Sequence, residues 1–176
     1  MDKDQAYGEL LQRVKEHGLL ASCSSVLGWD ERTYMPRQGS AHRAEQMALL
    51  ARMAHEMMTA ARIGELLAEV ADHPQVKLKD SAHAANFREI QRGYERAIKL
   101  PKELVEELAR VTTRAQQVWQ EARQADDFAA FRPWLEKIVA LKRQEAQAIG
   151  FGKGHPYDAL LDEYEPGATK IGRAHV

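Results

Sequence analysis

The sequence predicts an all-α protein, and three observations lead to this prediction. Good helix formers dominate the 176 residues: alanine, leucine, glutamate, arginine and glutamine. β-branched residues are sparse, and no segment alternates apolar and polar residues for long enough to predict a strand. The chain is long enough for one domain with a hydrophobic core, or for part of a larger domain.

The N-terminal stretch predicts helix up to a proline. A helical pattern covers about residues 3–16 and resumes over 19–32, so either Gly18 separates two helices or one kinked helix runs through it. Pro36 cannot continue the hydrogen-bond ladder, so the helix must end before it. Ser40 is a plausible N-cap for a helix over 40–58. Its buried stripe would contain Met47, Leu50, Met53 or Ala54, and Met57.

Two more helices are predicted in the middle of the chain. A short one covers about residues 63–71 and stops before Pro74. A longer one covers about residues 81–99. Its apolar residues recur at helical intervals and comprise Phe87, Ile90, Tyr94 and Ile98.

The C-terminal half predicts two long helices and a short one. Pro101 fits the first turn of a helix whose stripe is the clearest in the chain. That stripe contains Leu104, Leu108, Val111, Ala115, Val118 or Trp119, and Ala122. Asp126 or Asp127 would cap the second long helix, which ends near Gly150. Its inward residues would be Phe128, Phe131, Leu135, Ile138 and Leu141. A loop then leads to a short helix over 157–164, ended by Pro166 and Gly167.

Composition excludes several classes of partner. Lys and Arg number 25 against 26 Asp and Glu, so the net charge of −1 predicts neither nucleic acid nor an anionic membrane as partner. Cys23 is the only cysteine, so no internal disulfide can form, and its apolar surroundings favour a buried structural thiol over a reactive one. No stretch resembles a signal peptide or approaches the roughly 18 apolar residues of a membrane span, so we expect a cytoplasmic protein.

The histidines do not predict a metal site. His55-Glu56 begins like the His-Glu-x-x-His motif, whose two imidazoles share one helix face and bind zinc, but Thr59 stands at the second histidine position. We therefore reject this pair as a metal site. The remaining histidines form no pair at ligand spacing, and we interpret them as exposed or capping residues: His17, His42, His73, His83 and His155.

Three further motifs contain residue types that can take part in binding or catalysis. The segment Gly150–Gly154 resembles a phosphate-binding loop only in composition, because no strand precedes it and no Lys-Ser or Lys-Thr follows. The carboxylates of Asp162, Glu163 and Glu165 could bind a cation, but helical spacing spreads them over different faces, which favours a solvated helix end. For Trp29-Asp30 we favour a core tryptophan beside an aspartate that caps or pairs with Arg32 or Arg43; a functional role stays open.

Four stretches stand out by their order along the chain. They are Val26–Asp30 with Thr33, Met35-Pro36, Gly39, Arg43 and Gln46; Asn86–Glu89 with Arg92, Tyr94, Ala97 and Leu100-Pro101; Leu104-Val105 through Ala115, Trp119 and Ala122-Arg123 to Asp127-Phe128; and Pro156–Gly167. Together they resemble the carboxypeptidase Taq family of metal-dependent carboxypeptidases, the thermostable carboxypeptidase 1 type. The resemblance covers about residues 10–169.

The resemblance implies a fold, an activity and a cofactor. Members of this family are longer, almost wholly helical proteins with a deep cleft. They hydrolyse single amino acids from the C-termini of peptides with Zn²⁺ or another divalent transition metal such as Co²⁺. Their His-Glu-x-x-His motif and third, glutamate ligand lie C-terminal to everything in this chain. We therefore assign no catalytic, cofactor-binding or metal-binding residue here, and expect the chain alone to be inactive. Peptides are the expected substrates, and a homodimer is possible.

The last seven residues, KIGRAHV, do not follow from the rest of the chain. They match the translation of the start of a common sequencing adapter. We therefore expect residues 1–169 to be the incomplete N-terminal helical part of a metallocarboxypeptidase domain and residues 170–176 to be translated adapter. One face of the helix over 104–122 should then be more exposed than in a complete protein. The alternative is a stand-alone helical interaction or dimerisation module without catalysis.

Overall fold

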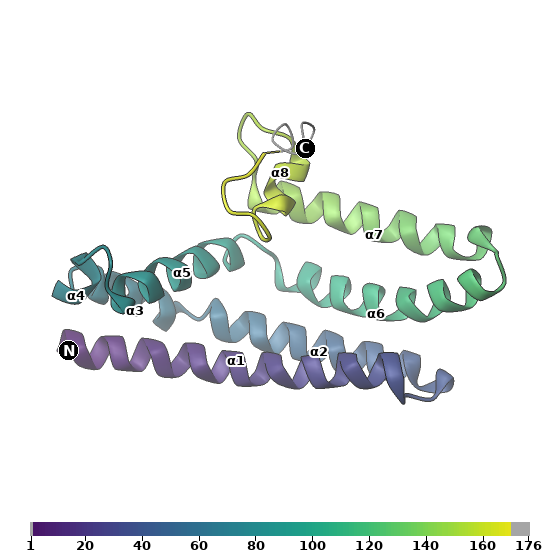
Figure 1. Ribbon diagram of the computed structural model, residues 1–176, viewed down its shortest axis with the longest axis horizontal. Coiled ribbons are helices and arrows are strands. Elements are labelled where there is room, and N and C mark those ends of the chain that lie inside the picture. Colours follow the sequence, from purple (N-terminus) through teal and green to yellow (C-terminus); the bar gives the residue numbers. More distant parts are fainter. Residues whose placement is uncertain (1, 170–176) are drawn as a thin grey trace. The chain divides into compact units, whose positions relative to one another are not determined.

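The computed structural model describes residues 2–169, which form helices joined by short connections and contain no strand (Figure 1). The all-α prediction is thus confirmed over this range. The chain divides into two compact units, one of Met1–Met35 with Leu49–Ile98, the other of Pro36–Ala48 with Lys99–Val176. Lys170–Val176, the predicted adapter translation, lies outside the described residues. No helix among the described residues is both long and apolar enough to cross a membrane.

Helix α1 (Lys3–Thr33) runs without interruption through Gly18, which decides between the two alternatives for this stretch. An interior glycine costs a helix only about 1 kcal/mol, and the good helix formers on both sides outweigh that cost. The backbone N–H groups of Tyr34 and Met35 both donate to the Asp30 carbonyl, at 3.0 and 2.9 Å, and end the helix before Pro36. The predicted stop at this proline is confirmed.

The core of the first unit joins the start of α1 to α3 (Ala61–Val70) and α5 (Ala82–Ala97). Its largest fully buried side chains are Leu10, Ile63, Leu66 and Val70. Phe87 and Tyr94 pack against this core as the helical spacing predicted, and Ser81 caps α5 by accepting from the Ala84 N–H at 3.0 Å.

Two expectations for this unit were wrong. Ile98 is 51 % exposed, because α5 ends at Ala97 and the stripe ends with it. A further short helix, α4 (Pro74–Lys77), was not predicted. Pro74 stands at the first position of α4, where a missing N–H costs nothing, so it starts a helix as well as ending the region before it.

Helix α2 (Ser40–Met58) begins differently from the prediction. A 3₁₀ turn, η1 (Arg37–Gly39), leads directly into it, and Ser40 has helical torsion angles (φ −57°, ψ −43°) and is not an N-cap. The predicted stripe is only half-buried, and the fully buried residues of α2 are Arg43, Ala44 and Ala48. At the position left open between Met53 and Ala54, Ala54 is half-buried and Met53 is 41 % exposed. Periodicity shows which residues share a face but not which face becomes covered. The remaining predicted positions are half-buried: Met47, Leu50, Ala54 and Met57.

In the second unit, α6 (Lys102–Gln124) and α7 (Phe128–Ile149) form an antiparallel pair (Figure 1). Leu104, Val111 and Leu141 are buried between them, with Leu108, Trp134 and Ile138 packed around these three. Pro101 precedes the helix as an extended N-cap and does not occupy its first turn. Asp127 caps α7 and Gly150 ends it at φ 82°, both as predicted.

Part of each predicted inward stripe on this pair is exposed. Trp119 is 45 % exposed, Phe128 62 % and Leu135 38 %. Trp119 and Phe128 lie at the end of the pair next to its connecting turn, outside the cluster of Leu104, Val111 and Leu141, although Ala122 in the same region is buried. At the stripe position left open between Val118 and Trp119, Val118 is half-buried and Trp119 is exposed. That one face of the 104–122 helix is more exposed than in a complete protein stays a prediction.

Helix α8 (Pro156–Leu161) follows a tight loop and ends three residues earlier than predicted. Gly152 of this loop has φ 52°, in the left-handed region that favours glycine. A Cβ at Gly154 would lie 3.0 Å from both the Asp158 carboxylate and the Phe151 carbonyl, so a larger residue would disturb the start of α8. The glycines that resemble a phosphate-binding loop thus serve the loop's own geometry.

Candidate functional site

The Trp29-Asp30 segment lies at the C-terminal end of α1, where it is open to solvent. Trp29 is 57 % exposed, so the interpretation as a core tryptophan was wrong. Its ring lies 5.4 Å from that of Tyr34, centroid to centroid, and Tyr34 is itself 76 % exposed. The expected partners of the Asp30 side chain, Arg32 or Arg43, stay a prediction.

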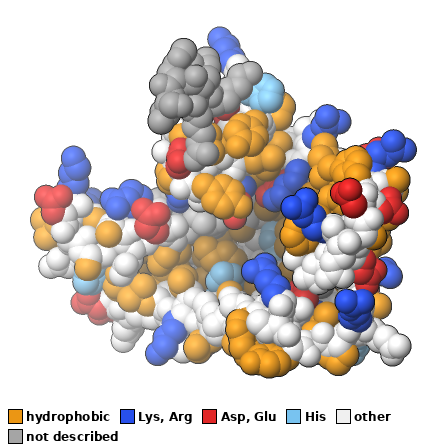
Figure 2. Space-filling view, turned by 45° about the vertical axis from the view of Figure 1, so that its right-hand side comes forward, with side chains coloured by type: hydrophobic (Ala, Val, Ile, Leu, Met, Phe, Trp, Pro, Cys, Tyr) orange, Lys and Arg blue, Asp and Glu red, His pale blue; other side chains and the backbone are white. Residues whose placement is uncertain are grey.

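Exposed apolar residues continue along α1 from this segment. Leu19, Val26 and Trp29 are each more than half exposed and follow one another at helical spacings of seven and three residues. Cys23 is also exposed, so the interpretation as a buried thiol was wrong. Figure 2 shows hydrophobic side chains, in orange, open to the surface in several places. An apolar strip on a helix suits packing against further protein better than contact with water.

At His55-Glu56 the local contacts are those of an ordinary helix. The Thr59 hydroxyl, at the position of the second zinc-binding histidine, donates to the His55 carbonyl at 2.8 Å. Glu56 pairs with Arg52 one turn earlier, at 3.3 Å. The general-base carboxylate of a metal-dependent hydrolase would instead point toward a bound water molecule.

A cluster that sequence reasoning missed lies at the start of the first unit. His73 is only 4 % exposed; its Nε2 contacts the Asp4 carboxylate at 2.8 Å, and its Nδ1 accepts from the Gln75 N–H at 3.1 Å. Because Nδ1 accepts a hydrogen bond, the ring proton is on Nε2. The histidines were expected to be exposed or to cap helices; His73 does cap α4, but it is buried. The Pro74 that follows it is the local signal that could have indicated a cap.

Aromatic rings surround this histidine. The ring of His83 lies 5.5 Å from that of His73 and 4.3 Å from that of Tyr7. Asn86 donates to the Tyr7 hydroxyl at 3.0 Å. The contacts with Asp4 and Tyr7 cross 69 and 79 residues of sequence, so no local pattern could have predicted them. This cluster anchors the N-terminus of α1 to α4 and α5.

The carboxylates near α8 are used in local structure. The His155 N–H donates to Asp158 at 2.8 Å, and the Tyr157 N–H donates to His155 Nδ1 at 3.1 Å, so these two side chains cap α8. Asp162 accepts from the Gly167 N–H at 2.9 Å and closes the turn after the helix. The prediction of a helix-end role for Asp162 over a cation site agrees with this bond.

The described residues do not fit a catalytic metal ion. Over residues 2–169, no three His, Cys, Asp or Glu side chains converge closely enough to hold one. Glu9 and Glu107, acidic groups with lowered pKa values, are instead paired with cations. Hydrogen bonds from Arg62, and to a smaller extent from Arg13, lower the pKa of Glu9 to about 2. Lys137, and to a smaller extent Arg110, lowers the pKa of Glu107. These pairs are structural ties: Glu9 to Arg62 joins α1 to α3, and Glu107 to Lys137 joins α6 to α7.

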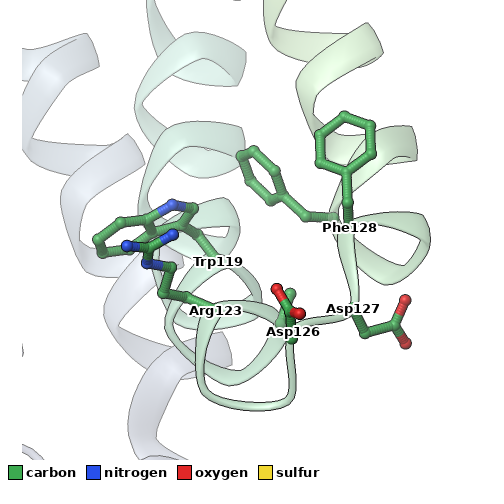
Figure 3. Close-up of a pocket in the computed structure, with 7 residues that line it drawn as sticks. Trp119, Arg123, Asp126, Asp127 and Phe128 are labelled. Atoms are coloured by element: carbon green, nitrogen blue, oxygen red, sulfur yellow. The ribbon is translucent and has the colours of Figure 1, made fainter.

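Two hollows lie within the second unit. One, of about 450 Å³, lies along α7 and α8 and is lined by apolar residues with Lys142, Arg143 and His155 among them. The other, of about 220 Å³, surrounds the turn between α6 and α7 (Figure 3). Three aromatic rings line it, those of Trp119, Phe128 and Phe131. Arg123 and two aspartates supply its polar groups.

Comparison with known proteins decides the family. The sequence model of the carboxypeptidase Taq (M32) metallopeptidase family matches residues 9–173. The chain belongs to this family. Within the M32 family, the thermostable carboxypeptidase 1 of Thermus thermophilus is 43 % identical over 175 residues, which cover 95 % of this chain and 34 % of that protein. The resemblance found in the motifs is thereby confirmed.

Solved structures of M32 carboxypeptidases have the same fold over the part that this chain covers. The BsuCP crystal structure superposes with a TM-score of 0.85 at 27 % identity and covers 95 % of this chain and 33 % of its own. Metallocarboxypeptidase 1 of Trypanosoma cruzi gives a TM-score of 0.71 at 35 % identity and similar coverage, 96 % and 33 %. This chain thus spans about a third of the length of the relatives it matches.

Proposed function

We propose that this chain is the N-terminal helical part, residues 1–169, of a metal-dependent carboxypeptidase that removes single amino acids from the C-termini of peptides. The observation that carries the proposal is the family match over residues 9–173, together with relatives of which this chain covers about a third. Zn²⁺ is the proposed metal, with Co²⁺ as a possible substitute, and the cytoplasm is the proposed compartment.

In this proposal the chain supplies scaffold and no reacting group. The described residues do not fit the metal, so its ligands and the general base would lie elsewhere in the whole enzyme. The exposed strip of Leu19, Val26 and Trp29 on α1 supports this division, since such a strip needs cover from further protein. No observation favours the alternative of a stand-alone interaction module.

A chimera tests the proposal directly. Residues 1–169 would replace the aligned third of the T. thermophilus thermostable carboxypeptidase 1, which is 43 % identical. We expect the chimera to release the C-terminal residue of a blocked dipeptide when supplied with zinc. A control chimera would carry a helical segment of equal length and composition in shuffled order, and should be inactive.

The chain alone provides the complementary measurement. Residues 1–169 with zinc should show no turnover of the same dipeptide above buffer. Turnover by this segment would mean that the active site lies within it. A folded but inactive chimera would show that the segment does not perform the scaffold role of its relatives.

A further inference from the structure

The hollow at the turn between α6 and α7 combines opposite charges with aromatic walls. Trp119 and Arg123 come from the last turns of α6, Asp126 from the turn itself, and Phe128 from the start of α7 (Figure 3). Trp119 is 45 % and Phe128 62 % exposed, so the rings are accessible to a ligand. The volume of about 220 Å³ suits a small molecule and not a folded partner.

Two of the three charged side chains that line this hollow, Arg123 and Asp126, have no side-chain partner among the described residues. Across residues 2–169, neither the Arg123 guanidinium nor the Asp126 carboxylate takes part in an ion pair or a side-chain hydrogen bond. The neighbouring Asp127 differs, because it accepts from the Ala130 N–H at 3.1 Å and caps α7. Arg123 can therefore bind an anionic group, and Asp126 a cationic one, without breaking an existing contact.

The backbone holds Asp126 in an unusual conformation. Its φ of 53° lies in the left-handed region, which glycine occupies most readily and which asparagine and aspartate occupy more often than other residues. The Asp127 N–H donates to the Ala122 carbonyl at 2.8 Å and the Ala125 N–H to that of Glu121 at 3.0 Å, which closes the end of α6 around it. A glycine would fit this position with less strain, so the turn does not require an aspartate.

We propose that this hollow binds a free α-amino acid with an apolar side chain. The guanidinium of Arg123 would bind the α-carboxylate, the carboxylate of Asp126 the α-ammonium group, and the aromatic rings the side chain. A zwitterion needs one charge of each sign beside an apolar surface, and this hollow offers all three. The inference stands on the hollow alone and does not depend on the proposed carboxypeptidase activity.

Calorimetric titration of the full chain with L-phenylalanine tests the proposal. Two further probes each lack one charge: N-acetyl-L-phenylalanine has no ammonium group, and L-phenylalanine amide has no carboxylate. We expect L-phenylalanine to bind at least tenfold more tightly than either, because each lost ion pair costs about a factor of ten or more. Equal binding of all three probes would overturn the proposal. So would the absence of any binding heat for L-phenylalanine at concentrations up to about 10 mM.

Variants locate the binding in this hollow. Arg123→Gln and Asp126→Asn should each weaken L-phenylalanine binding about tenfold or more. Asp126→Gly should weaken it equally, although it relieves the backbone, so a loss of binding cannot be ascribed to unfolding. Arg143→Gln, an exposed arginine on α7 outside this hollow, is the matched control and should bind normally. Unchanged binding in the Arg123 and Asp126 variants would refute the assignment.

Discussion

The Arg62 guanidinium on α3 donates two hydrogen bonds to the Glu9 carboxylate on α1, from Nη2 at 2.7 Å and from Nε at 3.1 Å. A paired, fork-like contact of this kind is stronger than a single exposed ion pair. It ties together two helices that are separated by 53 residues of sequence. Glu65 and Glu69 also contact the same guanidinium, at 3.1 and 3.2 Å.

This contact predicts a loss of stability in acid. Arg62 and Arg13 lower the pKa of Glu9 from 4.5 to about 2 in the folded chain, so the carboxylate stabilises the fold fully above about pH 4.5. That contribution should disappear as the pH falls from 4.5 toward 2. Glu9→Gln should therefore be less stable than the natural chain at pH 7, and the difference in thermal midpoint should shrink by pH 3. A difference that stays constant over this range would contradict the prediction.

Gly64 should be intolerant of even a methyl group. A Cβ at this position would lie 2.5 Å from the Tyr94 hydroxyl oxygen and 3.0 Å from the ring carbon that bears it, so the Tyr94 ring lies against α3 in this position only because a glycine is present. We expect Gly64→Ala to lower the free energy of unfolding by about 1–3 kcal/mol, the usual cost of overpacking, as measured by urea denaturation.

The matched control for Gly64 is Gly8 on α1, where nothing lies within 4 Å of an added Cβ. Gly8→Ala should raise the free energy of unfolding by up to about 1 kcal/mol, because alanine is the better helix former. We therefore expect the two Gly→Ala substitutions to change the free energy of unfolding in opposite directions. If both stabilise the chain, the close approach of Tyr94 is not maintained in solution.

The two histidine caps should differ in their contribution. His73 and His155 each accept a backbone hydrogen bond at the start of a helix and each precede a proline, but His73 is buried and also contacts Asp4. His73→Ala should cost about 2–4 kcal/mol, since it removes a cap and buried contacts together. His155→Ala should cost about 1 kcal/mol. Urea denaturation of both variants gives the comparison, and equal losses would argue against a buried role for His73.

Cys23 should react readily in the native chain. Its side chain is exposed on α1, so a thiol reagent such as dithionitrobenzoate needs no unfolding to reach it. We expect one equivalent to react in the folded state at nearly the rate seen in denaturant. Protection of the thiol would indicate that the exposed strip of α1 is covered, for example by a second copy of the chain.

Much of the fold could be predicted from local signals. The stop before Pro36, the Asp127 cap and the glycine end of α7 each depend on a few neighbouring residues, and all are present in the structure. The family could be predicted too, because its motifs are runs of residue types along the chain. The burial of Leu104, Val111 and Leu141 followed from helical spacing alone.

The errors share one physical cause. Helical spacing places Phe128 and Leu135 on the apolar stripe of α7, yet a stripe is buried only where another element covers it, and these two positions are exposed. The same limit applies to Trp29, whose size suggested a core position although nothing in the sequence states what lies opposite.

What the sequence by itself determined is the longer helices, many of their ends and the family, because these depend on backbone propensities and on residue order. The tertiary structure alone decided that His73 contacts Asp4, that Arg62 pairs with Glu9, and that Arg123 and Asp126 flank an aromatic hollow without a side-chain partner among residues 2–169. The first two contacts join residues far apart in the chain. Such contacts arise only when helices pack, and no local pattern of residues encodes that packing.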